Sequence, residues 1–232
     1  MPRTFATASL ALAAGLWLAT PAPAQMIVQY NFNNTTATDT TAAPSSMNPN
    51  VTANSTVNGA NIVQDYSLVD YGQQVLRAAI TNTATPDEAS AVNGGSYWGF
   101  TVQPNTGFKM NFSSFTFDAA RGGAGTPRTW YLYSSLAGFT PGSAIAFADV
   151  PTVRPILTPF TVDLSGAQFQ GLTNPVEFRM YLSTPATGQS LEFDNVTVNG
   201  TVIVVPEPAC TMSLAACVAA GWALRRRRRI SH

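Results

Sequence analysis

Short stretches in which apolar and polar residues alternate dominate the middle of the chain. In residues 175–183 (PVEFRMYLS), one face of an extended strand carries Val176, Phe178, Met180 and Leu182, and the other carries Glu177, Arg179 and Tyr181. Similar runs, separated by Gly, Pro, Asn and Asp, cover residues 26–32, 62–68, 74–80, 96–102, 107–118, 128–136, 160–164 and 190–205. The pattern predicts an all-β fold, an antiparallel two-sheet β-sandwich of about ten short strands that is jelly-roll-like.

Two of these runs change phase along their length. In residues 107–118 the alternation of phenylalanines resumes one residue out of step, which predicts a bulge near Ser113-Ser114 or a strand that switches its buried face. The last run shifts phase at Asp194-Asn195, and Asn199-Gly200 is typical of a tight turn. Residues 34–61, rich in Thr, Ala, Asn and Ser, predict a long polar loop with at most one edge strand.

The first 24 residues have the three parts of a secretory signal peptide. Arg3 gives a basic start, residues 5–19 are apolar, and Ala22-Pro23-Ala24 has the small side chains of a cleavage site. An N-terminal membrane anchor is the alternative, but the apolar run is short for a span. We therefore expect a signal helix, Sec-dependent export and cleavage after Ala24, which leaves residues 25–205 as the β-sandwich domain.

The C-terminal segment, residues 206–232, has a second apolar run. Residues 209–224 hold no charged side chain and would reach about 24 Å as a helix. Pro206 and Pro208 keep that helix from extending backwards. Five arginines follow, and they would stay on the cytoplasmic side of a membrane: Arg225, Arg226, Arg227, Arg228 and Arg229. The pattern predicts a transmembrane helix that anchors an exported body in the inner membrane, and an ordinary short C-terminal anchor is the alternative.

Pro206-Glu207-Pro208, the apolar run and the five arginines occur in an order that resembles the PEP-CTERM sorting signal of Gram-negative bacteria. This kind of segment is also labelled ice-binding protein C-terminal domain. The resemblance implies that a membrane-embedded exosortase recognises and removes the segment and passes the protein to the cell envelope or extracellular matrix. Ice binding itself would need a flat, regular, Thr-rich β face, and the threonines of residues 35–41 show no sustained repeat.

Charge and cysteine usage differ between the body and the ends. The chain holds 12 Lys+Arg and 12 Asp+Glu, but between Met26 and Val205 six basic residues stand against eleven acidic ones. A mildly acidic body lacks the basic face that nucleic-acid binding needs, so we expect no nucleic-acid partner. Both cysteines, Cys210 and Cys217, lie in the apolar tail, so the body must be stabilised by its hydrophobic core without disulfides.

Residues 108–205 resemble a group of jelly-roll proteins that carry PEP-CTERM tails. The similarity lies in FDAARGGAGTPRTWYLYSSLAGF, FTVDLSGAQFQGLTNPVEFRMYL and LEFDNVTVNGTV. The group commonly has an acidic residue where this chain has Ala137. The resemblance implies a fold and an export route, and it implies no particular activity.

Residue types that carry catalysis are scarce in the body. The one histidine, His232, lies beyond the arginines, which excludes Ser-His-Asp or Cys-His catalysis and His- or Cys-based zinc sites from the processed protein. The glycine-rich residues 121–125 follow a strand without opening a helix, which predicts a turn rather than a phosphate-binding loop. Glu177, Glu192 and Asp194 would suit a carboxylate-based hydrolase or lyase if they converged. Surface carboxylates are the commoner explanation, so we expect no enzyme.

Asp194 and Asn195 are the candidate metal ligands. They offer hard oxygen ligands at the point where the last strand shifts phase, and Asn31 from the first strand would complete a calcium site. The alternative is that Asp194-Asn195 caps a bulge through local hydrogen bonds.

Two tyrosines are the candidate ligand-binding residues. In residues 128–136 Trp130 and Leu132 share one face and are predicted core residues, whereas Tyr131 and Tyr133 share the other. An outer row of tyrosines would let the apolar face of a sugar ring stack on the aromatic rings. Ordinary core or amphipathic surface positions are the alternative explanation of such tyrosines.

These observations predict an exported cell-envelope or extracellular-matrix protein, sorted by a PEP-CTERM/exosortase system, with a structural or adhesive role. The first alternative is a carbohydrate-binding module on surface polysaccharide, with or without a structural calcium. The second is a carboxylate-based polysaccharide hydrolase or lyase. The expected partners are the Sec machinery, the exosortase, the membrane before processing, and extracellular polysaccharide.

Overall fold

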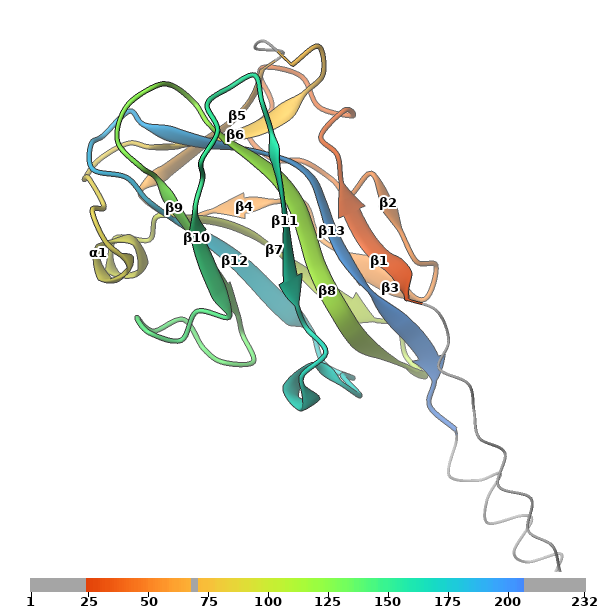
Figure 1. The fold of residues 1–232 in the computed structure, drawn as a ribbon. Helices are drawn as coiled ribbons and strands as arrows, with labels where there is room; N and C mark the ends of the chain where they lie inside the picture. Colours follow the sequence, from red (N-terminus) through yellow and green to blue (C-terminus); the bar gives the residue numbers. More distant parts are fainter. Residues whose placement is uncertain (1–23, 68–70, 207–232) are drawn as a thin grey trace, which may run out of the picture.

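Two antiparallel sheets face each other across an apolar core (Figure 1). The computed structural model describes residues 24–67 and 71–206. Sheet 1 consists of β1 (Gln25–Tyr30), β2 (Ser46–Met47), β5 (Ile62–Ser67), β6 (Val75–Ile80), β8 (Phe108–Arg121), β11 (Thr158–Asp163) and β13 (Ser190–Val204). Sheet 2 consists of β3 (Val51–Ala53), β4 (Val57–Asn58), β7 (Tyr97–Pro104), β9 (Thr129–Ser134), β10 (Ala146–Asp149) and β12 (Val176–Ser183). With one short helix, α1 (Glu88–Asn93), and one 3-10 turn, η1 (Ala167–Phe169), the described residues confirm the predicted all-β sandwich.

Successive strands pass back and forth between the two sheets. Sheet 1 has the order β11-β8-β13-β1-β2, while β6 also pairs with β13, and β5 with β6. Sheet 2 has the order β10-β9-β12-β7-β3, and β4 also pairs with β7. From β6 to β13, each strand lies in the opposite sheet to the strand before it. The exception is β10, which follows β9 within sheet 2. The connections therefore gather at the two ends of the sandwich.

The inward side chains of both sheets form one aromatic core. The ring of Phe178 on β12 lies 5.9 Å from Phe100 on β7 and 5.4 Å from Phe115 on β8. Trp98 of sheet 2 lies 5.2 Å from Phe193 of sheet 1. Tilted pairs at these distances are a favourable arrangement of aromatic rings. The inward alternation predicted for β12 is confirmed by the buried side chains Val176, Phe178, Met180 and Leu182.

The phase slip predicted in residues 107–118 is a β-bulge in β8. Successive residues of β13 pair with Ser114 and then with Phe112, so Ser113 is the extra residue. An extra residue shifts the side chains that follow it by one position, and for this reason Phe112 and Phe115 both point into the core.

The last strand also carries a bulge, and it continues past the predicted turn. Asp194 and Thr197 are three residues apart on β13, but their partners on β8 are two apart. The extra residue lies at Asn195, which has a φ of 51°, in the left-handed region that asparagine tolerates. The turn predicted at Asn199-Gly200 is wrong because β13 runs through both residues. Gly200 instead lets β13 lie close to β8, because a Cβ at this position would lie 2.0 Å from the backbone oxygen of Asn111.

Several other boundaries differ from the prediction. The first strand ends at Tyr30, and Phe32, with a φ of 57°, turns the chain and places its ring 5.7 Å from that of Tyr66. The polar residues 34–61 contain three short strands, β2, β3 and β4, because they pair with the edges of β1 and β7. Neither α1 nor β10 was predicted, since elements of six and four residues give little periodic signal.

Most of the predicted sorting and signal segments lies outside the described residues. This applies to residues 1–23, Glu207, Pro208, the predicted helix at residues 209–224, and residues 225–229. Pro206 is described, and it is exposed beyond the end of β13. Among the residues that the structure describes, no helix is both long and apolar enough to cross a membrane.

Candidate functional site

A line of aromatic residues crosses the outer face of sheet 2. Tyr97 on β7 is the direct partner of Tyr181 on β12, Tyr181 is the partner of Tyr131 on β9, and Tyr131 is the partner of Phe147 on β10. Direct partners in an antiparallel sheet point to the same face. These four residues therefore form a continuous row over four strands, which we call the aromatic row.

The aromatic row is most exposed at its β10 end. Phe147 is 67% exposed, and its ring stacks on that of Tyr131 at a centroid distance of 5.6 Å and an interplanar angle of 25°. At the β7 end Tyr97 and Tyr181 lie 5.1 Å apart, and Tyr181 is buried. The row thus presents an open aromatic surface that is supported from the side by a second ring.

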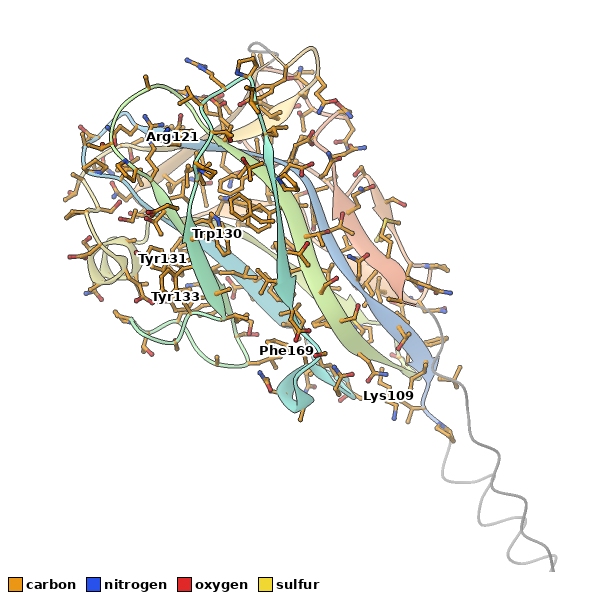
Figure 2. All side chains as sticks on the ribbon, in the orientation of Figure 1. Lys109, Arg121, Trp130, Tyr131, Tyr133 and Phe169 are labelled. Carbon is orange, nitrogen blue, oxygen red and sulfur yellow. The ribbon has the colours of Figure 1, made fainter. Side chains whose placement is uncertain are left out.

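The structure brings Tyr131 to this surface but not Tyr133. Figure 2 shows both tyrosines on β9, and Trp130 and Leu132 are buried in the main core as predicted. Tyr131 is half-buried. Tyr133 is fully buried, so the prediction that it forms part of an exposed ligand-facing row is wrong.

The short helix α1 is the reason that Tyr133 is buried. Its first turn is closed by a capping box, in which the Asp87 carboxylate accepts from the Ser90 N–H at 2.8 Å. The helix packs on β12 (Figure 1). Its Ala91 lies against Tyr133 and Tyr181. The Tyr133 hydroxyl donates to the Glu88 carboxylate. Burial, followed by the neighbouring Glu88, raises the pKa of Tyr133, which keeps its hydroxyl protonated.

Arg179 lies beside the aromatic row and is held from several sides. Its guanidinium carbon is 4.3 Å from the centroid of the Tyr97 ring and 3.9 Å from that of Phe139. Its Nε donates to Glu177 at 2.6 Å, and its Nη1 donates to the Tyr181 hydroxyl at 3.3 Å. Burial acts to lower the pKa of Arg179, but these hydrogen bonds outweigh it and raise the pKa. The row therefore has a fixed cation and a carboxylate at its side.

The three carboxylates proposed for hydrolysis do not converge. Glu177 lies on the outer face of sheet 2, whereas Glu192 and Asp194 lie on the outer face of sheet 1, on β13. Glu192 and Asp194 are each only 1% exposed. The residues after β5 cover them, since Tyr71 donates to Glu192 and Gln73 donates to Asp194. The predicted convergence is wrong because the residues belong to opposite layers.

The candidate calcium ligands are occupied by local hydrogen bonds. Asp194 accepts from the backbone N–H of Asn195 at 2.8 Å, and the Asn195 side chain donates to Asp118 at 2.9 Å. The Asn31 side chain accepts from the backbone N–H of Asn33 at 3.3 Å. These are the bulge-capping contacts given as the alternative to calcium. In residues 24–67 and 71–206 no group of three or more His, Cys, Asp or Glu residues is arranged to hold a metal ion.

Burial changes the acidity of both carboxylates on β13. Desolvation raises the pKa of Asp194 to about 6, with nearby Asp118 adding to the effect and the Asn195 N–H and Gln73 opposing it. Desolvation also raises the pKa of Glu192, against the stabilising contacts of Tyr71 and of Arg154, Arg77 and Arg128. A carboxylate with a pKa of about 6 loses its proton around that pH. The charge on this face of sheet 1 therefore depends on pH through Asp194.

Phe147 and Arg179 were not predicted as site residues. Phe147 belongs to a strand of four residues, AFAD, whose single alternation is too short to mark a face. Arg179 was placed on the correct outer face of β12, but no local signal links it to Tyr97 and Phe139. The aromatic row depends on register between four strands, and the register is a tertiary property.

No protein-family model and no curated protein matches the chain. Solved structures with a similar arrangement include the CBM22-1 xylan-binding domain of Paenibacillus barcinonensis Xyn10C, at 11% identity and a TM-score of 0.41, covering 78% of this chain and 97% of that one. They include the K3 cleaved adhesin domain of Lys-gingipain from Porphyromonas gingivalis, at 12% identity and a TM-score of 0.41, covering 76% and 98%. An arabinose-bound GH51 α-L-arabinofuranosidase matches at 9% identity and a TM-score of 0.42, covering 75% of this chain and 27% of the enzyme. The chain spans about a quarter of that enzyme, and at these scores none of the likenesses carries an argument about function.

Proposed function

We propose that the body is a carbohydrate-binding module that binds polysaccharide on the open half of the aromatic row of sheet 2, at Phe147 and Tyr131. The observation that carries the proposal is the exposed ring of Phe147, which is stacked on Tyr131 and continues a row of rings over four strands. A single exposed apolar side chain is common, but an exposed ring that stacks on a second ring gives a contiguous apolar surface, and such surfaces mark ligand-binding sites.

The chemistry of the row suits a sugar ring. The apolar C–H face of a pyranose stacks on an aromatic face, and the polar edge of the sugar needs hydrogen-bond partners close by. Glu177 and Arg179 supply an acceptor and a donor beside the row, and their ion pair holds both side chains in place. The rings are fixed by cross-strand contacts, so little side-chain entropy is lost when a ligand binds.

The order of the strands supports this role because it places a rigid sheet behind the row. The arrangement β6-β13-β8-β11 against β7-β12-β9-β10 is the one expected of a jelly roll, in which strands pass between the two sheets except at one pair of sequence neighbours, here β9 and β10. Four strands of sheet 2 then present their outer residues in register. Hydrogen-bonded strands in register are a suitable base for a binding surface, because sites built on strands are held more precisely than sites on loops.

We also propose the route by which the module reaches its ligand. The signal peptide and the PEP-CTERM-like tail would export the body and pass it to the cell envelope or extracellular matrix. A binding module in that place would attach to surface polysaccharide, and the adhesive role would follow from the binding. Detection of the processed body outside the inner membrane, by fractionation with and without a Pro206-Glu207-Pro208 deletion, tests the route.

Replacement of Phe147 by alanine tests the binding site. Binding of the purified full chain to a panel of soluble polysaccharides should weaken about tenfold in Phe147→Ala, because one stacking contact contributes about 1–1.5 kcal/mol. The matched control is Val204→Ala, which removes an apolar side chain of similar exposure, 65%, from sheet 1. Unchanged affinity in Phe147→Ala, or equal weakening in both variants, would contradict the proposal.

A further inference from the structure

Four of the six basic residues between Met26 and Val205 gather at one end of sheet 1. Arg77 lies on β6, Arg121 ends β8, Arg128 precedes β9, and Arg154 lies between β10 and β11. We call these four residues the arginine cluster. Figure 2 shows Arg121 at the opposite end of β8 from Lys109, the body's lysine. An acidic body thus carries a local concentration of positive charge.

The arginine cluster is built around Ser190 and Glu192 at the start of β13. Arg77 is the direct partner of Glu192, and its Nε donates to the Ser190 hydroxyl at 3.3 Å. Arg128 donates through Nη1 to the backbone oxygen of Ser190. Arg154 Nη1 lies 3.5 Å from Glu192 Oε1. Three guanidinium groups therefore meet within reach of two successive outward-facing residues of one strand.

Positive charge exceeds negative charge at this end. Among the described residues, the carboxylates in contact with the four arginines are Glu192 and Asp65, which accepts from Arg77 Nη1 at 2.7 Å. Asp70 lies outside the described residues, and adding its charge would still leave one positive charge in excess. Burial lowers the pKa of Arg128, and Arg121 lowers it further, which is the effect of cations held close together.

The most buried member of the cluster has an unused donor. Arg128 is 4% exposed, and its Nε has no acceptor within the described residues. Arg121 Nε is also buried without an acceptor in the same part of the chain. Leaving a buried donor without a partner is unfavourable, and more so when the group is charged. An unpaired buried donor in a native structure calls for an explanation, and an ordered water or a bound ion is one.

The glycine-rich turn after β8 closes over the cluster. A Cβ on Gly122 would lie 2.0 Å from the Ser190 hydroxyl and 2.9 Å from Glu192 Oε1, so a glycine is needed for this approach. Arg121 fixes the turn by donating to the backbone oxygen of Gly125 at 2.8 Å. In the part of the chain that the structure describes, the N–H groups of Gly123, Ala124 and Gly125 donate to no protein acceptor. Backbone N–H groups of this kind are common anion ligands.

We propose that the arginine cluster and the turn at residues 122–125 bind the oxyanion of an acidic polysaccharide, either a carboxylate or a sulfate group. Arg77 contacts the anion, since 34% of its side chain is exposed and its Nη2 is not needed for Asp65 or Ser190. The buried Arg128 supplies charge from beneath, and the turn supplies N–H donors. Guanidinium groups suit carboxylates and sulfates because they donate several hydrogen bonds in one plane.

This proposal extends the proposed carbohydrate binding to a second surface, and it rests on that function for the choice of polysaccharide as the source of the anion. The two surfaces lie on different sheets and use different chemistry, so an experiment can contradict one proposal and leave the other intact. A neutral sugar needs the aromatic row alone, whereas an acidic chain also engages the arginine cluster.

The test compares Arg77→Gln with Lys109→Gln in the full chain, using polygalacturonate, dextran sulfate and uncharged dextran as probes. Each variant removes one positive charge, but Lys109 lies at the far end of β8. We expect Arg77→Gln to weaken binding of at least one acidic polymer about tenfold, the effect of losing one charge-assisted hydrogen bond. Lys109→Gln should leave the affinity within about twofold, because a charge at the far end of β8 is screened by salt. Equal effects of the two variants would overturn the proposal.

A measurement on the unaltered protein covers the case in which Arg77→Gln does not fold. Bound acidic polymer should slow the modification of Arg77 by phenylglyoxal, measured by peptide mass spectrometry, and uncharged dextran should not slow it. No protection at saturating polymer would overturn the proposal. Binding of inorganic phosphate without binding of either acidic polymer would overturn the assignment to polysaccharide. If Phe147→Ala leaves all binding intact while Arg77→Gln weakens acidic polymers, the aromatic-row function fails and the oxyanion site stands.

Discussion

The outer faces of the two sheets are built in the same way but have opposite chemistry. On sheet 2, α1 and residues near Phe139 cover part of a row of aromatic rings. On sheet 1, the segment that contains Tyr71 and Gln73 covers a strand with two carboxylates. In both cases a short connecting segment buries residues that the strand alternation places toward solvent.

The comparison shows that the chemistry of the covering segment decides what burial does. When an apolar segment covers tyrosines, the contacts stabilise the folded state, because neutral rings lose little when they leave water. When a polar segment covers carboxylates, their pKa values rise, because a charged group loses its hydration and receives only a few hydrogen bonds in return. Sheet 2 should therefore respond to loss of volume, and sheet 1 should respond to pH.

The largest effect is expected from Tyr181→Ala, which removes the buried centre of the aromatic row. Tyr181 is 2% exposed and contacts Tyr97 at 5.1 Å and Tyr133 at 5.0 Å. Loss of a buried aromatic side chain should lower the free energy of unfolding by about 3–5 kcal/mol, measured by urea denaturation of the full chain. Tyr131→Ala, in the same row but half-buried, should cost about 1 kcal/mol. Similar losses in both variants would mean that the helix cover contributes nothing.

The face that each residue occupies could be predicted from the sequence, but its burial could not. Alternation placed Trp130 and Leu132 inside and Tyr131 and Tyr133 outside, and this division is correct. The exposure of Tyr133 was wrong because it depends on α1, a helix of six residues far away in the sequence. Asp87 and the serine three residues later are a local capping signal, but nothing in the sequence tells where so short a helix docks.

The bulges were predictable and the charged end was not, for a similar reason. The slip in the alternation of phenylalanines around Ser113 is visible within one short segment of the sequence. The arginine cluster combines residues from four separate segments, and each arginine taken alone is an ordinary polar residue beside a strand. The pairing of β6, β8 and β13 brings Arg77 and Arg121 together, and the connections before β9 and β11 add Arg128 and Arg154. Pairing between strands that are far apart in the chain is the feature of a β-sandwich that is hardest to predict from a single sequence.

On sheet 1 the expected effect is a pH dependence that Asp194→Asn removes. Burial raises the pKa of Asp194 to about 6 in the folded protein, above its value of about 3.9 in an unfolded chain. The folded state then holds the proton more tightly, so the free energy of unfolding falls as the pH rises from about 4 to about 6. The fall amounts to up to about 3 kcal/mol.

Urea denaturation of wild type and Asp194→Asn between pH 4 and pH 7 measures this contribution as the difference between the two curves. Asp163 provides a control of opposite sign, because hydrogen bonds from Ser165 lower the pKa of its carboxylate. Its stabilising contribution grows as the pH rises toward about 4 and is constant above it, so the Asp163→Asn and wild-type curves should run parallel between pH 4 and pH 7. Parallel curves for wild type and Asp194→Asn would show that the cover over this carboxylate admits water.

The smallest effect is expected from Tyr133→Phe, which keeps the packing of sheet 2 and removes one hydroxyl. That hydroxyl ties β9 to α1 through Glu88, which also accepts from the backbone N–H of Gly142 at 3.0 Å. Loss of this hydrogen bond should lower the free energy of unfolding by about 1 kcal/mol. Tyr97→Phe is the matched control, since the Tyr97 hydroxyl has no hydrogen-bond partner among the described residues, and it should change stability by less than about 0.5 kcal/mol. Because Tyr133 is buried, its loss of a hydroxyl should leave polysaccharide affinity unchanged, whereas weaker binding would mean that α1 moves aside and that the ligand reaches the covered half of the aromatic row.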